Sequence, residues 1–348
     1  MATFYKVTIK EIKQETANAV SVLFHIPQQL QSEFHFTAGQ YVTLQKEING
    51  EEVRRAYSIC SSPESGDIRV AIKAVEKGVF SMHATSDLKV GDEIEITAPE
   101  GRFLLNSEAN RNYIGFAAGS GITPILSMVK TVLAKESTST FTLVYGNKSE
   151  ADTIFFSELN TLKKSFSDRF KLHYIFSREN VKNELRGRID ENVTNYFVKN
   201  MYKETSFDTA FLCGPEEMIH EVSKTLESNK IAKENIHFEL FTASIDESAV
   251  SEVKEGATEV TILLDDEIAT FTMQQTDTIL AASLRNDLDA PYSCQGGVCS
   301  SCLGKVTEGK AVMVKNSILT DGEIEDGLIL TCQAYPTTAK IKIDFDDV

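Results

Sequence analysis

Residues 291–305 have the sequence PYSCQGGVCSSCLGK, which contains a C-x4-C-x2-C run. A further cysteine follows this run after 29 intervening residues. This spacing is typical of the four thiolate ligands of a plant-type [2Fe–2S] cluster. Because four thiolates must converge on a small cluster, the chain has to wrap tightly, and Gly296 and Gly297 supply the backbone freedom that such a loop needs. The ligands that the spacing predicts are Cys294, Cys299, Cys302 and Cys332.

The spacing alone leaves two other uses of these cysteines open. A zinc site also uses four cysteines, usually as two short C-x2-C pairs, whereas here only Cys299 and Cys302 form such a pair. A redox-active dithiol would use that pair and leave Cys294 and Cys332 unexplained. The iron–sulfur cluster accounts for all four cysteines, so we favour it.

The composition is that of a globular protein with more than one domain. The chain has 348 residues, of which 42% are hydrophobic and 25% are charged, and this length exceeds one ordinary core. No apolar run reaches the length of a membrane span, and the N-terminal residues alternate apolar and charged side chains instead of forming the apolar segment of a signal peptide. We therefore expect a soluble protein without membrane contact, and reduced thiols with a cluster favour the cytoplasm.

Acidic residues are concentrated in the last third of the chain. The formal net charge is −16, and residues 246–348 hold 19 acidic and 7 basic residues. An acidic surface can simply favour solubility, or it can steer the segment with the cluster towards a basic protein partner. Both interpretations stay open at this point. The sequence has no basic stripe, which disfavours nucleic-acid binding.

Residues 1–106 alternate short apolar stretches with turn residues such as Asn49-Gly50, and this spacing predicts an antiparallel β-barrel. One of its strands ends in Arg55-Ala56-Tyr57-Ser58. Arginine pairs well with a pyrophosphate, and a tyrosine on the same strand face can lie against a flat ring. An edge strand with a solvated arginine and a core tyrosine is the plainer alternative. The strands are expected at 5–11, 19–25, 41–45, 53–58, 67–74 and 93–97.

From about residue 107 the pattern changes to alternating strands and helices, which predicts a parallel sheet with helices on both faces. The first strand, at 113–118, runs into the turn GSGITP at 119–124 and an amphipathic helix at 125–134. Two glycines let the backbone approach a phosphate, and the following helix offers free N–H groups. A strand, turn and helix without a ligand would have the same local pattern, so the turn alone leaves nucleotide binding open.

The expected fold class is therefore multidomain. It combines an antiparallel β-barrel at 1–106, an α/β parallel-sheet domain at 107–241 and a β-grasp α+β domain at 257–348. Residues 242–256 are rich in Ser, Glu and Ala and have no strong pattern, so a flexible linker is expected there. In the last domain we expect a hairpin at 259–273, a helix at 278–288 and strands at 328–332 and 340–345.

Several of these stretches together resemble the ferredoxin–NADP reductase family of flavoproteins, fused to a C-terminal plant-type ferredoxin. RAYS is similar to the family's R-x-Y-S flavin signature and KGVFS at 77–81 to its phosphate turn, although many relatives have a glycine where Lys77 stands. GSGITP and the later CGP resemble its two nicotinamide-nucleotide turns. The resemblance implies FAD bound by Arg55, Ala56, Tyr57, Ser58, Ile72, Lys73, Gly78, Val79, Phe80, Ser81, Thr123 and Phe241. It implies NADPH bound by Gly119, Ser120, Gly121, Ile122, Thr123, Pro124, Ser177, Arg178, Cys213, Gly214 and Pro215.

Within this resemblance, Cys213 is expected to position the nicotinamide and not to act as a nucleophile, and Ser58 is expected near the site of hydride transfer. NADPH is favoured over NADH because Ser177 and Arg178 resemble the 2′-phosphate clamp of NADP-dependent relatives. Glu179 beside Arg178 argues mildly for NADH, and a solvated loop arginine is the plainer alternative.

The resemblance implies an electron path from NADPH through FAD and the [2Fe–2S] cluster to an oxygenase component. The domain order and the stretches RAYSICS, YGN, SRE and FLCGPE are most similar to reductase subunits that serve ring-1,2-phenylacetyl-CoA epoxidases. A reductase of another di-iron or ring-hydroxylating oxygenase, or an electron-carrier module without reductase activity, is the alternative. A self-sufficient oxygenase is disfavoured, because neither a haem-globin segment nor a paired E-x-x-H motif is present.

Overall fold

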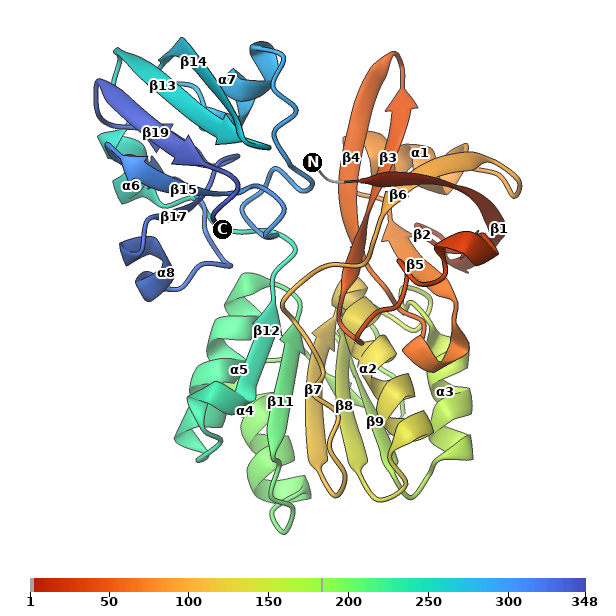
Figure 1. Cartoon of the computed structure of the whole chain (residues 1–348). Helices are drawn as coiled ribbons and strands as arrows, with labels where there is room; N and C mark the ends of the chain where they lie inside the picture. The colour runs from red at the N-terminus through yellow and green to blue at the C-terminus, as the bar shows by residue number, and fades with distance from the viewer. Residues whose placement is uncertain (1–2, 183) are drawn as a thin grey trace. The chain divides into compact units, whose positions relative to one another are not determined.

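The computed structural model describes residues 3–182 and 184–348. These residues form two compact units, Phe4–Phe241 and Thr242–Val348, and Figure 1 shows the elements of each. Within the described residues, no helix is long and apolar enough to cross a lipid bilayer. The two units are described separately.

The first part of the larger unit is the expected antiparallel barrel. Its strands neighbour one another in the order β4-β3-β6-β1-β2-β5, and a bridge between Ile59 and Val70 joins the end of β4 to β5, which closes the sheet. Asn49 and Gly50 both have positive φ, as a tight hairpin between β3 and β4 requires. The strands are β1 (Phe4–Thr16), β2 (Ala19–His25), β3 (Tyr41–Ile48), β4 (Glu51–Ser58), β5 (Ile68–Lys73) and β6 (Glu93–Thr97). Short helices lie at η1 (Gln28–Leu30), η2 (Pro63–Ser65) and α1 (Val79–Ser86).

The second part of this unit is a parallel sheet in the order β10-β9-β8-β7-β11-β12. Neighbouring residues of β9 contact helices on opposite faces, since the ring of Tyr174 packs on Phe156 and that of His173 on Phe197. The chain builds the sheet outward from β7 in one direction and then from β11 in the other, so β7 and β11 flank the topological switch point (Figure 1). The strands are β7 (Asn112–Ala118), β8 (Thr140–Asn147), β9 (Phe170–Phe176), β10 (Leu185–Arg186), β11 (Thr209–Cys213) and β12 (Ile236–Glu239). The helices are η3 (Gly119–Gly121), α2 (Ile122–Lys135), α3 (Phe156–Ser165), α4 (Glu191–Asn195), η4 (Tyr196–Met201), α5 (Glu216–Ser228) and η5 (Lys233–Asn235).

The smaller unit has a mixed sheet in the order β14-β13-β19-β15-β17, with α7 packed beside it and a separate β16-β18 ladder. The expected hairpin, helix and closing strand are all present. The strands are β13 (Ala257–Leu264), β14 (Glu267–Gln274), β15 (Leu303–Glu308), β16 (Ala311–Met313), β17 (Leu328–Leu330), β18 (Ala334–Pro336) and β19 (Lys340–Asp344). The helices are α6 (Glu247–Glu252), α7 (Ile279–Arg285) and α8 (Asp321–Glu325).

The segment 242–256 differs from the flexible linker that its composition predicts. It contains α6, whose first turn is capped by the Asp246 carboxylate, which accepts from the Ser248 and Ala249 N–H groups. Ala249 is buried, and the Asp246 N–H donates to the Val314 carbonyl at 2.8 Å. Capping and this contact with the neighbouring β-ladder order a stretch that has no hydrophobic periodicity of its own.

Candidate functional site

The two turns predicted to bind the nucleotide meet at the switch point of the parallel sheet. In the pairing of β7 with β11, Ala117 lies opposite Cys213, so the GSG and CGP turns leave the sheet side by side. A Cβ on Gly121 would lie 2.1 Å from the Cys213 carbonyl oxygen, so only glycine fits there. Ligands of open α/β sheets bind in the crevice at this point. Here η3 leads directly into α2, and the Ile122 N–H already donates to the Gly119 carbonyl.

Cys213, the last residue of β11 and the first of the CGP turn, has a buried thiol. Burial, with a smaller contribution from the Glu239 carboxylate, raises the pKa of Cys213 well above its usual value. A protonated, fully enclosed thiol is a poor nucleophile. This supports the expectation that Cys213 fills space beside a bound ring and does no covalent chemistry.

Glu239 lies beside Cys213, on the neighbouring strand β12, and was not predicted from the sequence. It pairs with Cys213 across the β11–β12 ladder, and its Oε2 accepts a hydrogen bond from Ser58 Oγ at 3.1 Å. Although Glu239 keeps some accessible surface, the surrounding protein disfavours its charge and raises its pKa to about 8, and the bond from Ser58 offsets this only partly. Ser58 and Glu239 thus join the flavin-signature strand of the barrel to the nucleotide sheet.

On the barrel side, the predicted flavin residues gather around α1. The ring of Tyr57 packs on that of Phe80 with centroids 5.7 Å apart. Ser81 Oγ accepts from the Val75 N–H at 3.1 Å and contacts the Gly78 carbonyl at 3.3 Å, so this hydroxyl shapes the turn before α1. No side chain of the described residues caps α1, which leaves its first N–H groups available to a phosphate.

Basic side chains surround the nucleotide turn. Lys73 Nζ lies 3.7 Å from where a Cβ on Gly119 would stand, and burial, reinforced by Lys148, lowers the pKa of Lys73. The Arg178 N–H donates to the Lys148 carbonyl at 2.9 Å, which brings these two exposed cations to one edge of the sheet. Lys73, which the resemblance assigned to FAD, therefore lies beside the other nucleotide turn, and Lys148 is a basic residue that the sequence did not single out.

In the smaller unit the cysteine thiols lie in two pairs. Cys294 and Cys299 are close enough to hydrogen-bond, and so are Cys302 and Cys332. Within the described part of the chain, no three His, Cys, Asp or Glu side chains are arranged around a position for a single ion. Two thiol pairs suit a binuclear cluster, with one pair for each iron, better than one tetrahedral ion.

The loop around these thiols has the features that a cluster needs. Gly297 has φ +74°, and a Cβ there would lie 2.8 Å from the Lys315 carbonyl oxygen, whereas a Cβ on Gly296 would make only an ordinary contact with the Cys294 carbonyl oxygen at 3.7 Å. The Gly296 N–H donates to Cys294 Sγ at 3.3 Å. Hydrogen bonds, first from the Cys299 thiol and then from backbone N–H groups, lower the pKa of Cys294 to about 6. These hydrogen bonds favour the thiolate of Cys294, which is the form that binds metal, whereas the pKa of its partner Cys299 is raised.

Comparison with known proteins assigns each part of this arrangement. Family models match in chain order an oxidoreductase FAD-binding domain at residues 6–104, an oxidoreductase NAD-binding domain at 116–224 and a 2Fe-2S iron-sulfur cluster binding domain at 262–337. The chain is 37% identical to one of the subunits of 1,2-phenylacetyl-CoA epoxidase from Escherichia coli K12, over 99% of both chains. The chain belongs to the ferredoxin–NADP reductase family of flavoproteins that carry a C-terminal [2Fe–2S] domain.

Two further proteins extend the comparison. The chain is 31% identical to the ferredoxin reductase component of 3-ketosteroid-9-alpha-monooxygenase from Rhodococcus rhodochrous, over 97% of this chain and 96% of that protein. The solved structure of phthalate dioxygenase reductase has the same fold, with a TM-score of 0.64, 23% identity and 98% coverage of both chains. The expected fold class, and the FAD, nicotinamide-nucleotide and [2Fe–2S] cofactors of this family, are thereby confirmed.

The individual contacts of this ferredoxin–NADP reductase family member stay predictions. Ile72 is fully buried in the barrel core. Thr123 Oγ1 bonds to the Ser120 carbonyl at 3.1 Å and thus stiffens the nucleotide turn. Val79 and Phe241 are exposed, which leaves both available to a cofactor.

Proposed function

We propose that this protein is the NADPH-dependent reductase component of an oxygenase system. Two contacts carry this proposal. Ser58 of the flavin-signature strand donates a hydrogen bond to Glu239, and Glu239 pairs with Cys213 of the nucleotide turn, all within one compact unit. The domains with their cofactors supply the rest of the electron path.

The bound groups supply the redox chemistry, because FAD accepts a hydride and releases electrons singly and the [2Fe–2S] cluster takes one electron at a time. The chain binds and orients them. Arg55 and the N-terminus of α1 would hold the FAD pyrophosphate, and Tyr57 would lie along the ring. Gly121 lets the two nucleotide turns pack against each other, and Cys213 and Glu239 would line the place where the nicotinamide meets the flavin.

NADPH is the nucleotide that the site favours. Lys73 lies beside the nucleotide turn and near Lys148, and the backbone of Arg178 is bonded to that of Lys148 at the carboxyl edge of the sheet. The neighbouring Glu179 carboxylate accepts from the Glu150 N–H at 2.8 Å, so it is engaged within its own loop. Lys73 also has the Asp152 carboxylate nearby. Cations at this edge suit the extra 2′-phosphate of NADPH, whereas NADH-specific sites use an acid for the ribose diol.

The electron acceptor that we propose is a phenylacetyl-CoA epoxidase, as in phenylacetate degradation, because one of the subunits of that enzyme is similar over the whole chain. A ring-hydroxylating or other oxygenase is the second candidate, favoured by the similarity to the ketosteroid monooxygenase reductase. The acidic character of residues 246–348 suits docking to a basic surface on such a partner.

An anaerobic titration of the holo-protein tests the electron path. NADPH is expected to bleach the flavin absorption and then to produce the EPR signal of a reduced [2Fe–2S] cluster, and NADH is expected to do so less efficiently. Flavin bleaching without the cluster signal would contradict the path. Addition of the purified epoxidase oxygenase component should reoxidise the cluster, and a faster reoxidation by a ring-hydroxylating oxygenase would favour the second candidate.

A further inference from the structure

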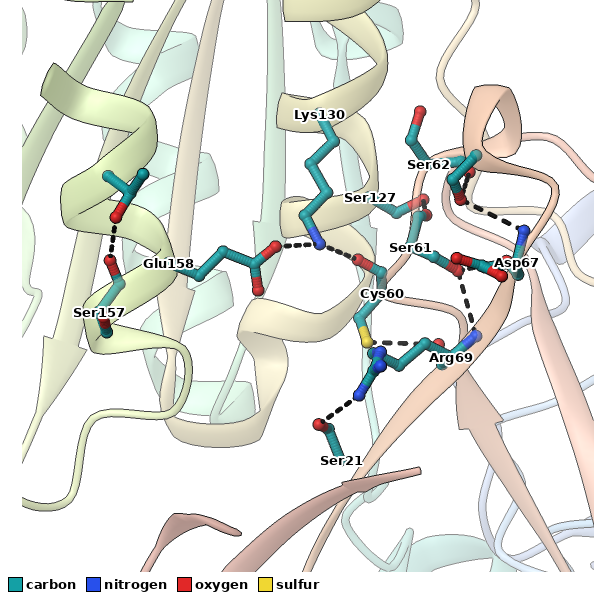
Figure 2. A network of polar contacts seen from close by, with 12 residues as sticks. Ser21, Cys60, Ser61, Ser62, Asp67, Arg69, Ser127, Lys130, Ser157 and Glu158 are labelled. Atoms are coloured by element: carbon teal, nitrogen blue, oxygen red, sulfur yellow. Dashed lines mark hydrogen bonds and ion pairs between the residues drawn. The ribbon is translucent and has the colours of Figure 1, made fainter. Parts of the chain in front are cut away.

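Helix α2 is attached to the barrel immediately beyond the flavin-signature strand. Ser127 Oγ donates to the Ser61 carbonyl oxygen at 2.6 Å, and Lys130 Nζ donates to the Cys60 carbonyl oxygen at 3.1 Å. Figure 2 shows both bonds reaching from the helix to the loop that follows β4. Two consecutive carbonyls of the barrel are thus held by two side chains one turn apart on the helix.

Both donors are themselves held in place. Ser127 is fully buried. Lys130 pairs with Glu158 of α3 at 2.5 Å, and its ammonium lies 6.0 Å from the centroid of the Phe155 ring. Because the ammonium is fixed from the side of the nucleotide domain, its bond to the barrel has a defined direction (Figure 2).

The acceptors are equally constrained. The Cys60 N–H and thiol both donate to the Arg69 carbonyl of β5, at 2.8 and 3.2 Å. Ser61 Oγ donates to the Asp67 carbonyl at 2.6 Å and accepts from the Arg69 N–H at 3.1 Å. These bonds make residues 60 and 61 a stiff extension of the barrel sheet. A displacement of these two residues would therefore also displace Ser58.

Apolar packing fills only part of this junction, where Ala38 and Ala71 of the barrel share a buried cluster with Met128 of α2. A cavity of about 630 Å³ opens between the barrel and helices α2 and α3. Its barrel wall includes Ser61 and Arg69, and its helix wall includes Leu133 and Leu162. Where apolar packing is incomplete, hydrogen bonds contribute more to fixing the position of the helices relative to the barrel.

We propose that Ser127 and Lys130 are positioning residues for hydride transfer. Ser127 lies one turn beyond Pro124 of the nucleotide turn, and Cys60 lies two residues beyond Ser58 at the flavin site. The two bonds therefore connect the segment that holds NADPH to the segment that holds FAD, and they set the distance between the reacting rings. This inference rests on the proposed function, since it concerns the same hydride transfer.

The test is anaerobic stopped-flow reduction of the holo-protein by NADPH, for Lys130→Met and Ser127→Ala. Each variant is expected to lower the limiting rate constant of flavin bleaching by roughly tenfold, because small displacements of reacting atoms cost this much or more. The Kd for NADP+ is expected to stay within about twofold. NADPH deuterated at C4 should give a larger isotope effect than in the wild type, and Lys130→Arg should restore most of the rate, because it keeps a donor.

The matched control is Lys163→Met, which removes a lysine bond to the Leu172 carbonyl (3.0 Å) inside the nucleotide domain and should leave the rate unchanged. Limiting rates within twofold of the wild type, or a lower melting temperature without a slower hydride transfer, would overturn the positioning role. A wild-type flavin that NADPH does not bleach would instead overturn the proposed function. If Ser127→Ala fails to fold, the series at the partly exposed Lys130 still decides the matter.

Discussion

The raised pKa of Glu239 bears directly on the proposed hydride transfer. Its pKa of about 8 and its bond from Ser58 mean that the carboxyl is mainly protonated at neutral pH and becomes charged above pH 8. A hydride carries negative charge towards this place, so an ionised Glu239 would oppose its arrival. We therefore expect the rate constant of flavin bleaching by NADPH to fall as pH rises through about 8 in the wild type.

Glu239→Gln should remove this titration and leave a flat profile between pH 7 and 9. Glu234→Gln, at an exposed position of the same unit, is the control and should keep the wild-type profile.

The same carboxyl also makes stability depend on pH. Because the folded pKa lies above the usual 4.5, the folded unit holds a proton that the unfolded chain has lost. This contribution to stability is complete below pH 4.5 and disappears as pH rises through 8. Thermal unfolding at pH 6 and pH 9 should accordingly show a smaller fall in Tm for Glu239→Gln, and an unchanged pH profile of bleaching in that variant would contradict the assignment.

Gly121 gives a second prediction at the residue scale. A methyl group at this position would lie 2.1 Å from the Cys213 carbonyl oxygen, so Gly121→Ala must push the two nucleotide turns apart. We expect a loss of NADPH-dependent flavin bleaching of about 100-fold, with FAD still bound. Gly322→Ala, where the added Cβ meets no atom of the described residues within 4 Å and φ is not left-handed, is the control and should retain activity. FAD content and bleaching rate are measured on the same samples.

At the scale of elements, the sequence predicts what depends on local pattern. Alternation and turn residues located the strands of the barrel, and the glycine turns after β7 and β11 were placed correctly as strand endings. The sequence cannot show which strands become neighbours, and for this reason Glu239 was missed: its position beside Cys213 follows from the pairing of β12 with β11. Helix α6 was missed because one cap and one buried alanine stabilise it, without amphipathic periodicity.

The turn before α1 is an element whose shape depends on one hydroxyl. Ser81 is buried and bonds to backbone groups of Val75 and Gly78, so Ser81→Ala should loosen the N-terminus of α1. We expect the Kd for FAD to rise roughly tenfold, as for the loss of one or two buried hydrogen bonds. Ser86→Ala, at the exposed far end of α1, is the control. Flavin fluorescence on dilution measures the Kd, and equal retention of FAD by both variants would show that the hydroxyl is dispensable.

At the scale of the whole molecule, the two compact units separate the two kinds of electron transfer. Phe4–Phe241 contains the residues proposed for FAD and NADPH, and Thr242–Val348 contains the cysteine pairs. Each unit has its own hydrophobic core. Reduction of the flavin by NADPH should therefore continue when a mutation in Thr242–Val348 stops electron transfer through the cluster.

Cys332→Ser tests this separation, because it removes the predicted ligand that lies farthest from the others in the chain and breaks the Cys302–Cys332 pair. We expect the [2Fe–2S] EPR signal and electron delivery to the oxygenase component to be lost, while NADPH bleaches the flavin at a rate within about twofold of the wild type. Cys60→Ser, at a buried cysteine of the other unit, controls for the loss of a thiol in the EPR measurement alone and should keep the cluster signal. A Cys332→Ser protein that also loses flavin bleaching would mean that the first unit needs the second in order to work, and the two-unit division would then not describe how the enzyme functions.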